Sequence, residues 1–416
     1  MSKTFYINGD KLLDGEVNIS GSKNCALCLI AGALLVDGQT KLINIPHIKD
    51  IEKFIDILRY LNVDVVFNND ELLIDTTNIQ IKTLKIDEVS QFRASYYLIG
   101  ALLNRFKKIE INKSGGCNFT PRPINYHIEM FKFFGVICKE YDTYYSFELT
   151  QNKESEFTLP YPSFGATINS LLFGVSLNRE IAIKNACEEV EIAHFIKFLR
   201  SMGADIISES NNLYINPSNF RATSFYNIPD RIEAGTFMLM GPIIMKKLKI
   251  NNIIPEHNKS ILDLFSFLDI NYEMNSNSLT IWKQNINKSC IVETGINETI
   301  SSDLQPLLSV FCLHIPRISL IKEKVYLSRF THIKPLKKMG GEIYESNHNI
   351  LINGIMKLCG KEIVATDLRM AAAMVFAGLC AEGQTIIREG NYIDRGYEDI
   401  LNKLKSLGAD IYVKET

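Results

Sequence analysis

The hydrophobic and polar positions repeat one pattern six times along the chain. In each copy an amphipathic helix ends at a turn residue and a short strand-like run follows, as in FLRSMGADII at 198–207 and LKSLGADI at 404–411. The turn residue is glycine in four copies and Asn or Asp in the other two. These residues tolerate the left-handed backbone conformation that commonly ends a helix. The six predicted helix ends are at Asn62, Gly135, Gly203, Asp269, Gly340 and Gly408, spaced 66 to 73 residues apart.

A second pattern recurs with the same period: an apolar helix rich in small residues, such as EAGTFMLMGPII at 233–244. A helix that is apolar nearly all round has to be buried within a layer. A strand-like run follows each apolar helix, and a hairpin with an Asn- or Asp-rich turn follows the amphipathic one, for example at 64–75. The repeating unit is therefore helix, strand, helix and hairpin, which predicts an α/β fold of the α+β type. The six apolar helices are expected at 22–35, 92–103, 164–177, 233–244, 302–313 and 367–379.

The two ends of the chain fit together in this scheme. The sixth copy, ADIYVKET at 409–416, stops after one hairpin strand, and KTFYING at 3–9 supplies an unattached strand that can complete it. We therefore predict two domains of three units each, with both termini in the same domain. That domain comprises residues 1–22 and 231–416, and the other comprises residues 23–230 and carries a mobile loop at 112–124.

Composition and charge narrow the class of protein. Hydrophobic residues make up 46% of the chain and charged residues 22%, as in ordinary globular proteins. A net charge of −2 gives no reason to expect nucleic acid or an anionic membrane as a partner. No apolar stretch reaches the roughly 18 residues that cross a bilayer, and the start MSKTFYING is not a signal segment. We therefore expect a soluble cytoplasmic protein with neither of those partners.

Nine cysteines are scattered singly, which is typical of a protein in the reducing cytosol. The one C-x-x-C spacing, Cys25 to Cys28, lies in an apolar helical run and has no second pair. Two interpretations stay open, a zinc or redox pair and a pair of ordinary buried helix cysteines, and the missing second pair favours the latter. We predict no metal site.

Polar residues gather at the starts of the apolar helices. A helix start offers free N–H groups and the positive end of the helix dipole, which favour a bound anion. Cations at such a start oppose the dipole, so Arg and Lys there predict bound anions that offset the repulsion. The alternative is solvated surface charge, and Asp303 and Asp367 can also serve as N-caps. The residues at equivalent starts are Lys23, Arg93, Gly165, Glu233, Asp303, and Asp367 with Arg369.

One segment, KSGGCNFTPRPINYHI at 113–128, interrupts the second unit. Its two adjacent glycines allow a loop to move or to approach a ligand closely. Cys117 follows them and stands near Lys113 and Arg122 in the sequence. Nearby cations lower the pKa of a thiol and make it reactive. The alternative is a cysteine that merely fills a packing gap, and these residues alone leave both open.

Eight short motifs, taken in order along the chain, resemble the UDP-N-acetylglucosamine enolpyruvyl transferases. No single motif is specific, but together they span essentially the whole sequence. The motifs are SGSKN at 20–24, FRAS at 92–95, GGC with RP at 115–123, PDRIEAGTF at 229–237, SDLQ at 302–305, SRF at 328–330, ATDLR at 365–369 and IDRGYE at 393–398. The resemblance implies the fold of that family, six βαβαββ units in two inside-out barrel domains.

The resemblance also implies a reaction. A sugar hydroxyl adds to C2 of phosphoenolpyruvate while a proton goes to C3, and phosphate is then eliminated. Such an enzyme has to hold a phosphate dianion and a carboxylate, which calls for several cations. Phosphoenolpyruvate is a co-substrate and no cofactor is expected. With UDP-N-acetylglucosamine as acceptor this reaction is the first committed step of peptidoglycan precursor synthesis. We expect a monomer or weak oligomer.

The resemblance assigns roles to individual residues. Asp303 corresponds to the base that takes the hydroxyl proton, with Asp367 as its acidic neighbour, and a base has to lie within hydrogen-bond reach of that proton. Cys117 corresponds to the loop cysteine that assists proton delivery or product release and is the target of fosfomycin. The cations that hold phosphoenolpyruvate correspond to Lys23, Arg122 and Arg395. The other expected substrate contacts are Asn24, Arg93, Pro123, Asn125, Ser163, Phe164, Gly165, Arg231, Val325, Arg329 and Arg369.

Four residues depart from the family pattern on the side of the nucleotide sugar. Asn125 replaces an acidic residue that recognises the uracil base in the family. Tyr161 replaces a lysine that lies near the diphosphate. Leu327 replaces an acidic residue and Tyr392 a histidine, whereas His127 remains and is interpreted as structural rather than catalytic. Two explanations compete. One is a divergent enzyme of wall synthesis, which we favour, and the other is a paralogue acting on another uridine nucleotide, such as UMP, or another nucleotide sugar.

Other classes share parts of this pattern. Shikimate 3-phosphate enolpyruvyl transferases have the fold, but their lid lacks the cysteine of GGC. RNA 3′-phosphate cyclases use related units but need an ATP and nucleotidyl-histidine site that the sequence does not show. A non-catalytic protein that binds nucleotide sugar predicts lost charges among the predicted cations, and none is lost. The sequence therefore favours an active transferase.

Overall fold

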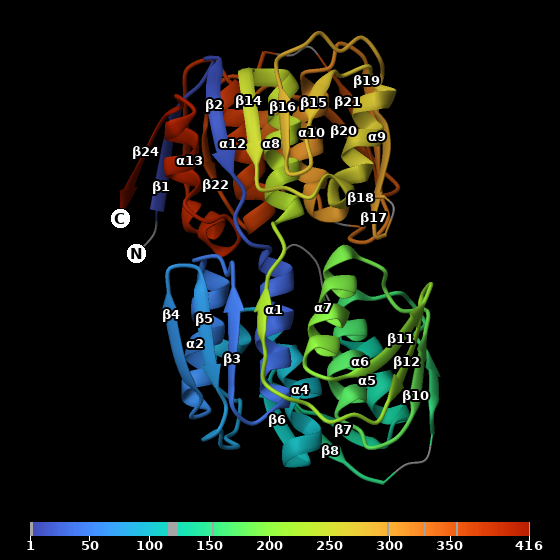
Figure 1. Cartoon of the computed structure of the whole chain (residues 1–416). Coiled ribbons are helices and arrows are strands. Elements are labelled where there is room, and N and C mark those ends of the chain that lie inside the picture. Colours follow the sequence, from blue (N-terminus) through green and yellow to red (C-terminus); the bar gives the residue numbers. More distant parts are fainter. Residues whose placement is uncertain are drawn as a thin grey trace. The chain divides into compact units, whose positions relative to one another are not determined.

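The protein is described from a computed structural model, which covers residues 3–114, 124–151, 154–297, 299–327, 329–354 and 357–415. The described chain divides into two compact units (Figure 1). Unit 1 contains residues up to 20 and from 229 onward, and unit 2 contains the described residues of 21–228. The chain thus changes unit two residues before each predicted boundary.

Each unit has three apolar helices at its centre. In unit 2 these are α1 (Lys23–Gly32), α4 (Tyr97–Phe106) and α6 (Phe164–Val175), and in unit 1 they are α8 (Arg231–Ile244), α10 (Gln305–Leu313) and α12 (Leu368–Cys380). Within each unit the three helices contact one another. Short 3₁₀ turns, η2 (Arg93–Tyr96) and η4 (Ser302–Leu304), precede α4 and α10 and take up the beginnings of two predicted helices.

Six amphipathic helices pack beside the apolar ones. They are α2 (Lys49–Tyr60), α5 (Asn125–Phe133), α7 (Val190–Ser201), α9 (Lys259–Phe267), α11 (Ile333–Lys338) and α13 (Ile400–Ser406). Each ends two residues before one of the six predicted turns, and all six turn residues have positive φ, from 57° at Asp269 to 109° at Gly203. The predicted left-handed helix ends are therefore confirmed, including the two that lack glycine.

Three sheets belong to unit 2. Their strand orders are β13-β3-β5-β4, β6-β8-β7 and β11-β12-β10-β9. The strands are β3 (Gln39–Ile43), β4 (Asp64–Asn68), β5 (Glu71–Asp75), β6 (Lys108–Asn112), β7 (Val136–Glu140), β8 (Tyr144–Leu149), β9 (Glu156–Thr158), β10 (Ile181–Lys184), β11 (Asp205–Glu209), β12 (Asn212–Asn216) and β13 (Ser224–Tyr226).

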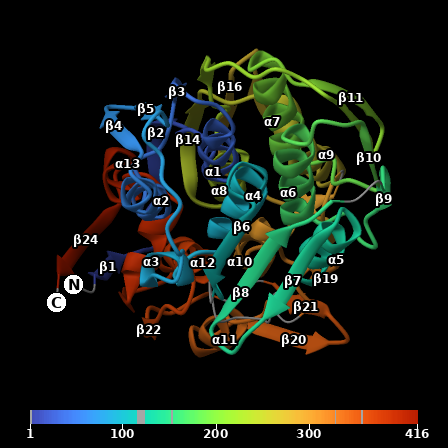
Figure 2. The same cartoon turned by 90° about the horizontal axis from the view of Figure 1, so that it is seen from below.

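Unit 1 has three further sheets, with the orders β15-β16-β14-β2, β18-β17-β19-β21-β20 and β22-β23-β1-β24. The strands are β1 (Lys3–Asn8), β2 (Leu13–Asn18), β14 (Met245–Asn251), β15 (Tyr272–Met274), β16 (Ser278–Ile281), β17 (Ile291–Gly295), β18 (Ile300–Ser301), β19 (Ile318–Glu323), β20 (Glu342–Ser346), β21 (Asn349–Asn353), β22 (Glu362–Val364), β23 (Gln384–Arg388) and β24 (Asp410–Glu415). In each unit the sheets contact the central helices from outside, as Figures 1 and 2 show.

The N-terminal strand completes the sixth repeat. β1 lies between β23 and β24 and pairs antiparallel with both, from Lys3 opposite Glu415 to Asn8 opposite Asp410. This confirms the predicted joining of the two ends. The sequence did not reveal that two copies exchange the strands that precede their apolar helices. β2 precedes α1 of the first copy but pairs with β14 of the fourth. β13 precedes α8 of the fourth copy but pairs with β3 of the first.

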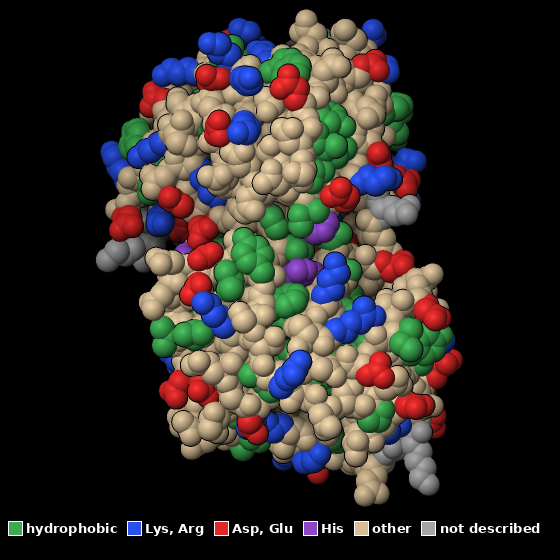
Figure 3. Space-filling model, viewed as in Figure 1, with side chains coloured by type: hydrophobic (Ala, Val, Ile, Leu, Met, Phe, Trp, Pro, Cys, Tyr) green, Lys and Arg blue, Asp and Glu red, His purple; other side chains and the backbone are tan. Residues whose placement is uncertain are grey.

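Charged side chains of both signs are interspersed over the face shown in Figure 3. Among the described residues, no helix combines the length and apolar character needed to cross a bilayer.

Candidate active site

A carboxylate and two guanidinium groups meet near the starts of α10 and α12. Asp303 lies in η4, Arg369 is the second residue of α12, and Arg329 lies between β19 and α11. Asp303 Oδ1 accepts a hydrogen bond from Arg329 Nη1 at 2.7 Å, and Asp303 Oδ2 accepts one from Arg369 Nη2 at 2.7 Å. The two arginine side chains are 4% and 9% exposed, and that of Asp303 is 23% exposed. The structure therefore brings together three of the predicted site residues in unit 1.

Electrostatic interactions within this cluster outweigh the effect of burial on the pKa values of its groups. Burial alone would raise the pKa of Asp303, but Arg369 and Arg329 outweigh that effect and hold the pKa of the carboxyl well below its usual range. Burial alone would lower the pKa of Arg369, and Asp303 reverses that effect, so the pKa of Arg369 is raised. Two cations and one carboxylate leave a net positive charge, which favours an anionic ligand.

Glu323, at the end of β19, fixes the two segments that carry this cluster. Its Oε1 accepts hydrogen bonds from Ser302 Oγ at 2.8 Å and from the backbone N–H groups of Val325 and Tyr326 at 2.8 and 2.9 Å. Its Oε2 accepts one from Thr294 Oγ1 at 2.8 Å. The sequence analysis missed Glu323, although strand alternation in ISLIKE places it on the buried face. An acid at such a position is the signal that would have found it.

Asp367 is the N-cap of α12. Its Oδ1 accepts hydrogen bonds from the backbone N–H groups of Arg369 and Met370, both at 3.0 Å, and its Oδ2 accepts one from Thr331 Oγ1 at 2.8 Å. The N-cap alternative considered for this residue is therefore the observed one. By capping the helix, Asp367 fixes the backbone from which Arg369 reaches Asp303.

Lys23 is the first residue of α1 and forms a buried ion pair. Its Nζ lies 2.6 Å from Asp50 Oδ2 of α2, and the two side chains are 12% and 4% exposed. The sequence predicted a bound anion wherever a cation stands at a helix start. For Lys23 the protein itself supplies that anion, the side chain of Asp50. Asn24 follows in α1, and its carbonyl oxygen accepts a hydrogen bond from Cys28 Sγ at 3.2 Å.

Cys25 and Cys28 are both buried in α1. Burial, with a further contribution from Glu191, raises the pKa of the Cys28 thiol well above its usual value. Among the described residues, no group of His, Cys, Asp and Glu side chains has an arrangement that would hold a metal ion. The favoured interpretation of ordinary buried helix cysteines fits these observations.

A chain of neutral hydrogen bonds links three segments of unit 2. The backbone N–H of Gly100 donates to Asn169 Oδ1 at 2.9 Å, and Asn169 Nδ2 lies 2.8 Å from His127 Nδ1. Burial, with Arg93 adding to it, lowers the pKa of His127 to about 3, so the ring is neutral at ordinary pH. Since Gly100 fixes the orientation of the Asn169 amide, Nδ1 accepts and the proton lies on Nε2.

The start of α6 lies against this histidine. A Cβ added at Gly165 would lie 3.0 Å from His127 Cε1 and Nε2, so glycine permits the close approach. Ser163 is the N-cap of α6 and its Oγ accepts a hydrogen bond from the Ala166 N–H at 3.4 Å, while Phe164 is the first residue of the helix. A neutral ring whose Nδ1 accepts a hydrogen bond from Asn169 fits the structural role expected for His127.

One of the departures from the family pattern, Tyr161, belongs to an aromatic pair. The rings of Tyr126 and Tyr161 stack with their centroids 6.0 Å apart and their planes 22° apart. Asn125, the first residue of α5, is exposed and precedes Tyr126 directly. Leu327 is 45% exposed, and Tyr392, in η5 (Gly390–Arg395), packs against the core of unit 1. The side chains at positions 125, 126 and 161 are thus all uncharged.

The other predicted residues are placed as follows. Arg93 begins η2 and lies 6.0 Å from the centre of the Tyr96 ring, Arg231 is the first residue of α8, and Arg395 is the last residue of η5. Glu233 is buried in α8, and its carboxylate pairs with Lys403 at 2.5 Å and accepts a hydrogen bond from the Ser20 N–H at 2.9 Å. These contacts fix the backbone at Ser20, where the chain leaves unit 1. Cys117, Arg122 and Pro123, and with them most of the predicted mobile loop, lie outside the described residues.

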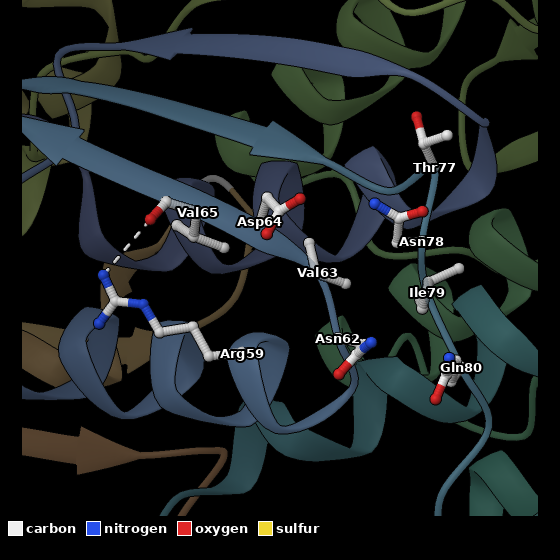
Figure 4. A pocket seen from close by; sticks show the side chains of 9 residues that line it. All are labelled: Arg59, Asn62, Val63, Asp64, Val65, Thr77, Asn78, Ile79 and Gln80. Atoms are coloured by element: carbon white, nitrogen blue, oxygen red, sulfur yellow. Dashed lines mark hydrogen bonds between the residues drawn. The ribbon is translucent and has the colours of Figure 1, made fainter.

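A surface pocket in unit 2 lies away from these residues (Figure 4). It is formed by the end of α2, the strand that follows and the segment after β5, and Arg59 Nη2 donates to the Val65 carbonyl oxygen at its edge at 3.4 Å. None of the predicted site residues lines it. The lining residues are Arg59, Asn62, Val63, Asp64, Val65, Thr77, Asn78, Ile79 and Gln80.

Residues 7–404 match the family model described as EPSP synthase (3-phosphoshikimate 1-carboxyvinyltransferase). The match covers almost the whole chain, and the chain therefore belongs to this family of enolpyruvyl (1-carboxyvinyl) transferases. Within the family it resembles a particular group of enzymes. A Staphylococcus aureus (strain MRSA252) protein named UDP-N-acetylglucosamine 1-carboxyvinyltransferase 2 is 37% identical over 411 residues, which is 98% of both chains. A protein of the same name from Staphylococcus epidermidis is 36% identical over the same length. The resemblance predicted from the motifs is confirmed.

Solved structures show the same fold. The enolpyruvyl transferase NikO from Streptomyces tendae matches with a TM-score of 0.91 and 22% identity, covering 100% of this chain and 99% of that one. EPSP synthase from Acinetobacter baumannii matches with a TM-score of 0.75 and 16% identity, covering 100% of both chains. The predicted fold class is confirmed.

Proposed function

We propose that this chain transfers the enolpyruvyl group of phosphoenolpyruvate to a hydroxyl of UDP-N-acetylglucosamine and releases phosphate. The cluster of Asp303 with Arg329 and Arg369 carries the proposal, because it joins a carboxylate to two buried cations in one place. The full-length likeness to enzymes named for UDP-N-acetylglucosamine supports the acceptor. In this reading the enzyme acts in the cytoplasm at the first committed step of peptidoglycan precursor synthesis.

The proposed reaction has two steps. In the first, the acceptor hydroxyl loses its proton to Asp303, its oxygen bonds to C2 of phosphoenolpyruvate, and a proton is added at C3. In the second, the C2–O bond to phosphate breaks, a proton leaves C3 and the double bond is restored. Arginine guanidinium groups favour such substrates because they bind carboxylate and phosphate oxygens in pairs.

The remaining residues take the roles that the resemblance implies. Lys23, Arg122 and Arg395 hold phosphoenolpyruvate, and Cys117 assists proton delivery or product release and reacts with fosfomycin. Asn24, Ser163 and Gly165 contact the nucleotide sugar. The reaction as proposed needs no metal or cofactor, and the enzyme acts as a monomer or weak oligomer without nucleic-acid or membrane partners.

A second acceptor has one observation in its favour. Asn125 and Tyr161 replace a carboxylate and a lysine of the family pattern on the acceptor side and leave uncharged side chains there. This change favours an altered acceptor, such as UMP or another uridine nucleotide. Steady-state phosphate release with UDP-N-acetylglucosamine, UDP and UMP as acceptors distinguishes the two. We expect release with UDP-N-acetylglucosamine, and release with UMP alone would overturn the proposed acceptor.

Fosfomycin gives an independent test of the loop cysteine. We expect time-dependent loss of activity, a mass increase of one inhibitor molecule on Cys117, and no labelling of a Cys117→Ser variant. Labelling of another cysteine, or none, would show that Cys117 does not have this role.

A further inference from the structure

The Asp303 carboxylate is held by two cations at once. Each of its oxygens accepts a hydrogen bond from a different guanidinium, Oδ1 from Arg329 and Oδ2 from Arg369, both at 2.7 Å. Such charge-assisted hydrogen bonds are among the strongest in proteins. A carboxylate in this state is a weak proton acceptor, in line with the lowered pKa of Asp303. The arrangement therefore conflicts with the role of a base that accepts a hydroxyl proton.

The two arginine side chains are more deeply buried than that of the aspartate. Arg329 Nη1 makes a second hydrogen bond to the Ser302 carbonyl oxygen at 3.0 Å, and its guanidinium lies 4.2 Å from the centre of the Tyr326 ring. Arg369 lies 6.0 Å from the centre of the Tyr397 ring, and its backbone N–H is held by Asp367. The Asp303 side chain, by contrast, is 23% exposed. If one partner leaves the cluster, the aspartate is the one with access to solvent.

The neighbouring acids Asp367 and Asp230 are engaged with the N–H groups at two helix starts. Asp367 uses Oδ1 for two helix N–H groups and Oδ2 for Thr331, and Asp230 uses Oδ1 for the N–H groups of Ile232 and Glu233 at the start of α8. Asp230 and Tyr397 still contribute to the raised pKa of Arg369. Burial, with Arg329 adding to it and Asp367 opposing it, lowers the pKa of His332 to about 3, so this ring is neutral. Asp303, by contrast, is engaged with both guanidinium groups.

We propose that Asp303 is an internal anion occupying an arginine pair, and that an anionic substrate which binds to Arg329 and Arg369 displaces it and thereby makes it a base. The inference rests on the proposed function for the reaction that follows, but not on the identity of the acceptor. Anion binding and proton affinity are then linked: the ligand weakens the hold of the arginines on Asp303, and a protonated Asp303 competes less with the ligand. The base is thus activated only when the anionic substrate is present.

The test is calorimetric binding of 2-phospholactate, a saturated analogue with the same two anionic groups, to the full chain without acceptor. Asp303→Asn removes the internal anion, and the control Glu293→Gln removes one negative charge from a half-exposed side chain of the same unit. We expect Asp303→Asn to bind the analogue about tenfold or more tightly than the wild type, because the competing state is lost. Glu293→Gln is expected to change affinity by less than about threefold, because the charge of an exposed side chain is screened by solvent.

A second measurement concerns protons. At about pH 5, titrations in buffers of different ionisation enthalpy should show that the wild type takes up more protons on binding than Asp303→Asn does. Equal or weaker binding by Asp303→Asn, together with equal proton uptake, would overturn the inference. If Asp303→Asn does not fold, as judged by circular dichroism, Asp303→Ser takes its place. Failure of turnover with UDP-N-acetylglucosamine would refute the proposed acceptor but leave these binding results unaffected.

Discussion

Units 1 and 2 have different kinds of side chains at the starts of their central helices. In unit 1, Asp303, Arg329 and Arg369 form a cluster of three charges, and Glu323 fixes it with four hydrogen bonds. In unit 2, the start of α6 faces a chain of neutral groups that runs from Gly100 through Asn169 to His127. The same repeat thus supports a charged and an uncharged arrangement.

The difference indicates how the two units divide the chemistry. A cluster with net positive charge changes its internal pairing when an anion arrives, because ionic contacts can exchange partners. A neutral relay cannot exchange charge, and it fixes instead the direction of one N–H donor. Under the proposed function, Asp303 of unit 1 accepts the proton, whereas the neutral groups of α5 and α6 in unit 2 contribute an oriented N–H donor.

The largest effect is expected from Asp303 itself. Asp303→Asn should lower kcat by about 1,000-fold, since loss of a general base usually costs that order of rate. The same variant should bind 2-phospholactate more tightly, so turnover and anion affinity move in opposite directions. Phosphate-release kinetics check this, and a kcat within about tenfold of the wild type would remove Asp303 from the role of base.

The next effect concerns the residue that positions the cluster. Glu323→Ala should lower kcat by about 100-fold, because it removes the acceptor that fixes the segments of Asp303 and Arg329. Glu323→Gln should recover part of the activity, since its amide oxygen still accepts hydrogen bonds. Glu293→Gln, which changes a half-exposed acid on the neighbouring strand β17, is the matched control. Equal losses in Ala and Gln variants would contradict a positioning role.

Buried histidines in the two units should make stability depend on pH. His127 and His332 have pKa values lowered to about 3 by burial, whereas an unfolded histidine titrates near about 6.5. The unfolded chain therefore binds more protons below that value, and stability falls as pH falls. Each histidine should contribute about 1.4 kcal/mol per pH unit between about pH 6 and pH 4.

Urea unfolding at several pH values checks this, with His127→Gln reporting on unit 2 and His332→Gln on unit 1. Each variant should show a smaller dependence on pH than the wild type, and the variants should differ little from one another in slope. A slope unchanged by either substitution would mean that neither ring is buried in its neutral form.

The smallest effect is expected at the uncharged acceptor region. Asn125→Asp with Tyr161→Lys introduces one charge of each sign and separates the aromatic pair. We expect the KM for UDP-N-acetylglucosamine to change by less than about tenfold and kcat to stay nearly constant, since solvated charges contribute little. A large fall in kcat would show that this region takes part in the chemical step and would weaken the division between the units.

Local patterns predicted the repeat because each copy has its own turn residue and its own apolar helix. All six turns have the predicted left-handed backbone, since that conformation depends on a residue's immediate neighbours. The motifs also predicted which charged residues gather at the starts of α10 and α12. What they did not predict depends on long-range contacts: the pairing of Lys23 with Asp50, the hydrogen bonds of Glu323, and the exchange of β2 and β13 between copies.

The central position of β1 has a consequence for biosynthesis. Its two hydrogen-bonded neighbours, β23 and β24, lie more than 370 residues further along the chain. During translation the first strand emerges long before either partner exists, whereas every strand of unit 2 is complete once Tyr226 has left the ribosome. Unit 2 can therefore fold cotranslationally, and unit 1 closes its last sheet only after β24 has been synthesised. Until then β1 is an unpaired strand, a state in which chaperones bind and aggregation begins.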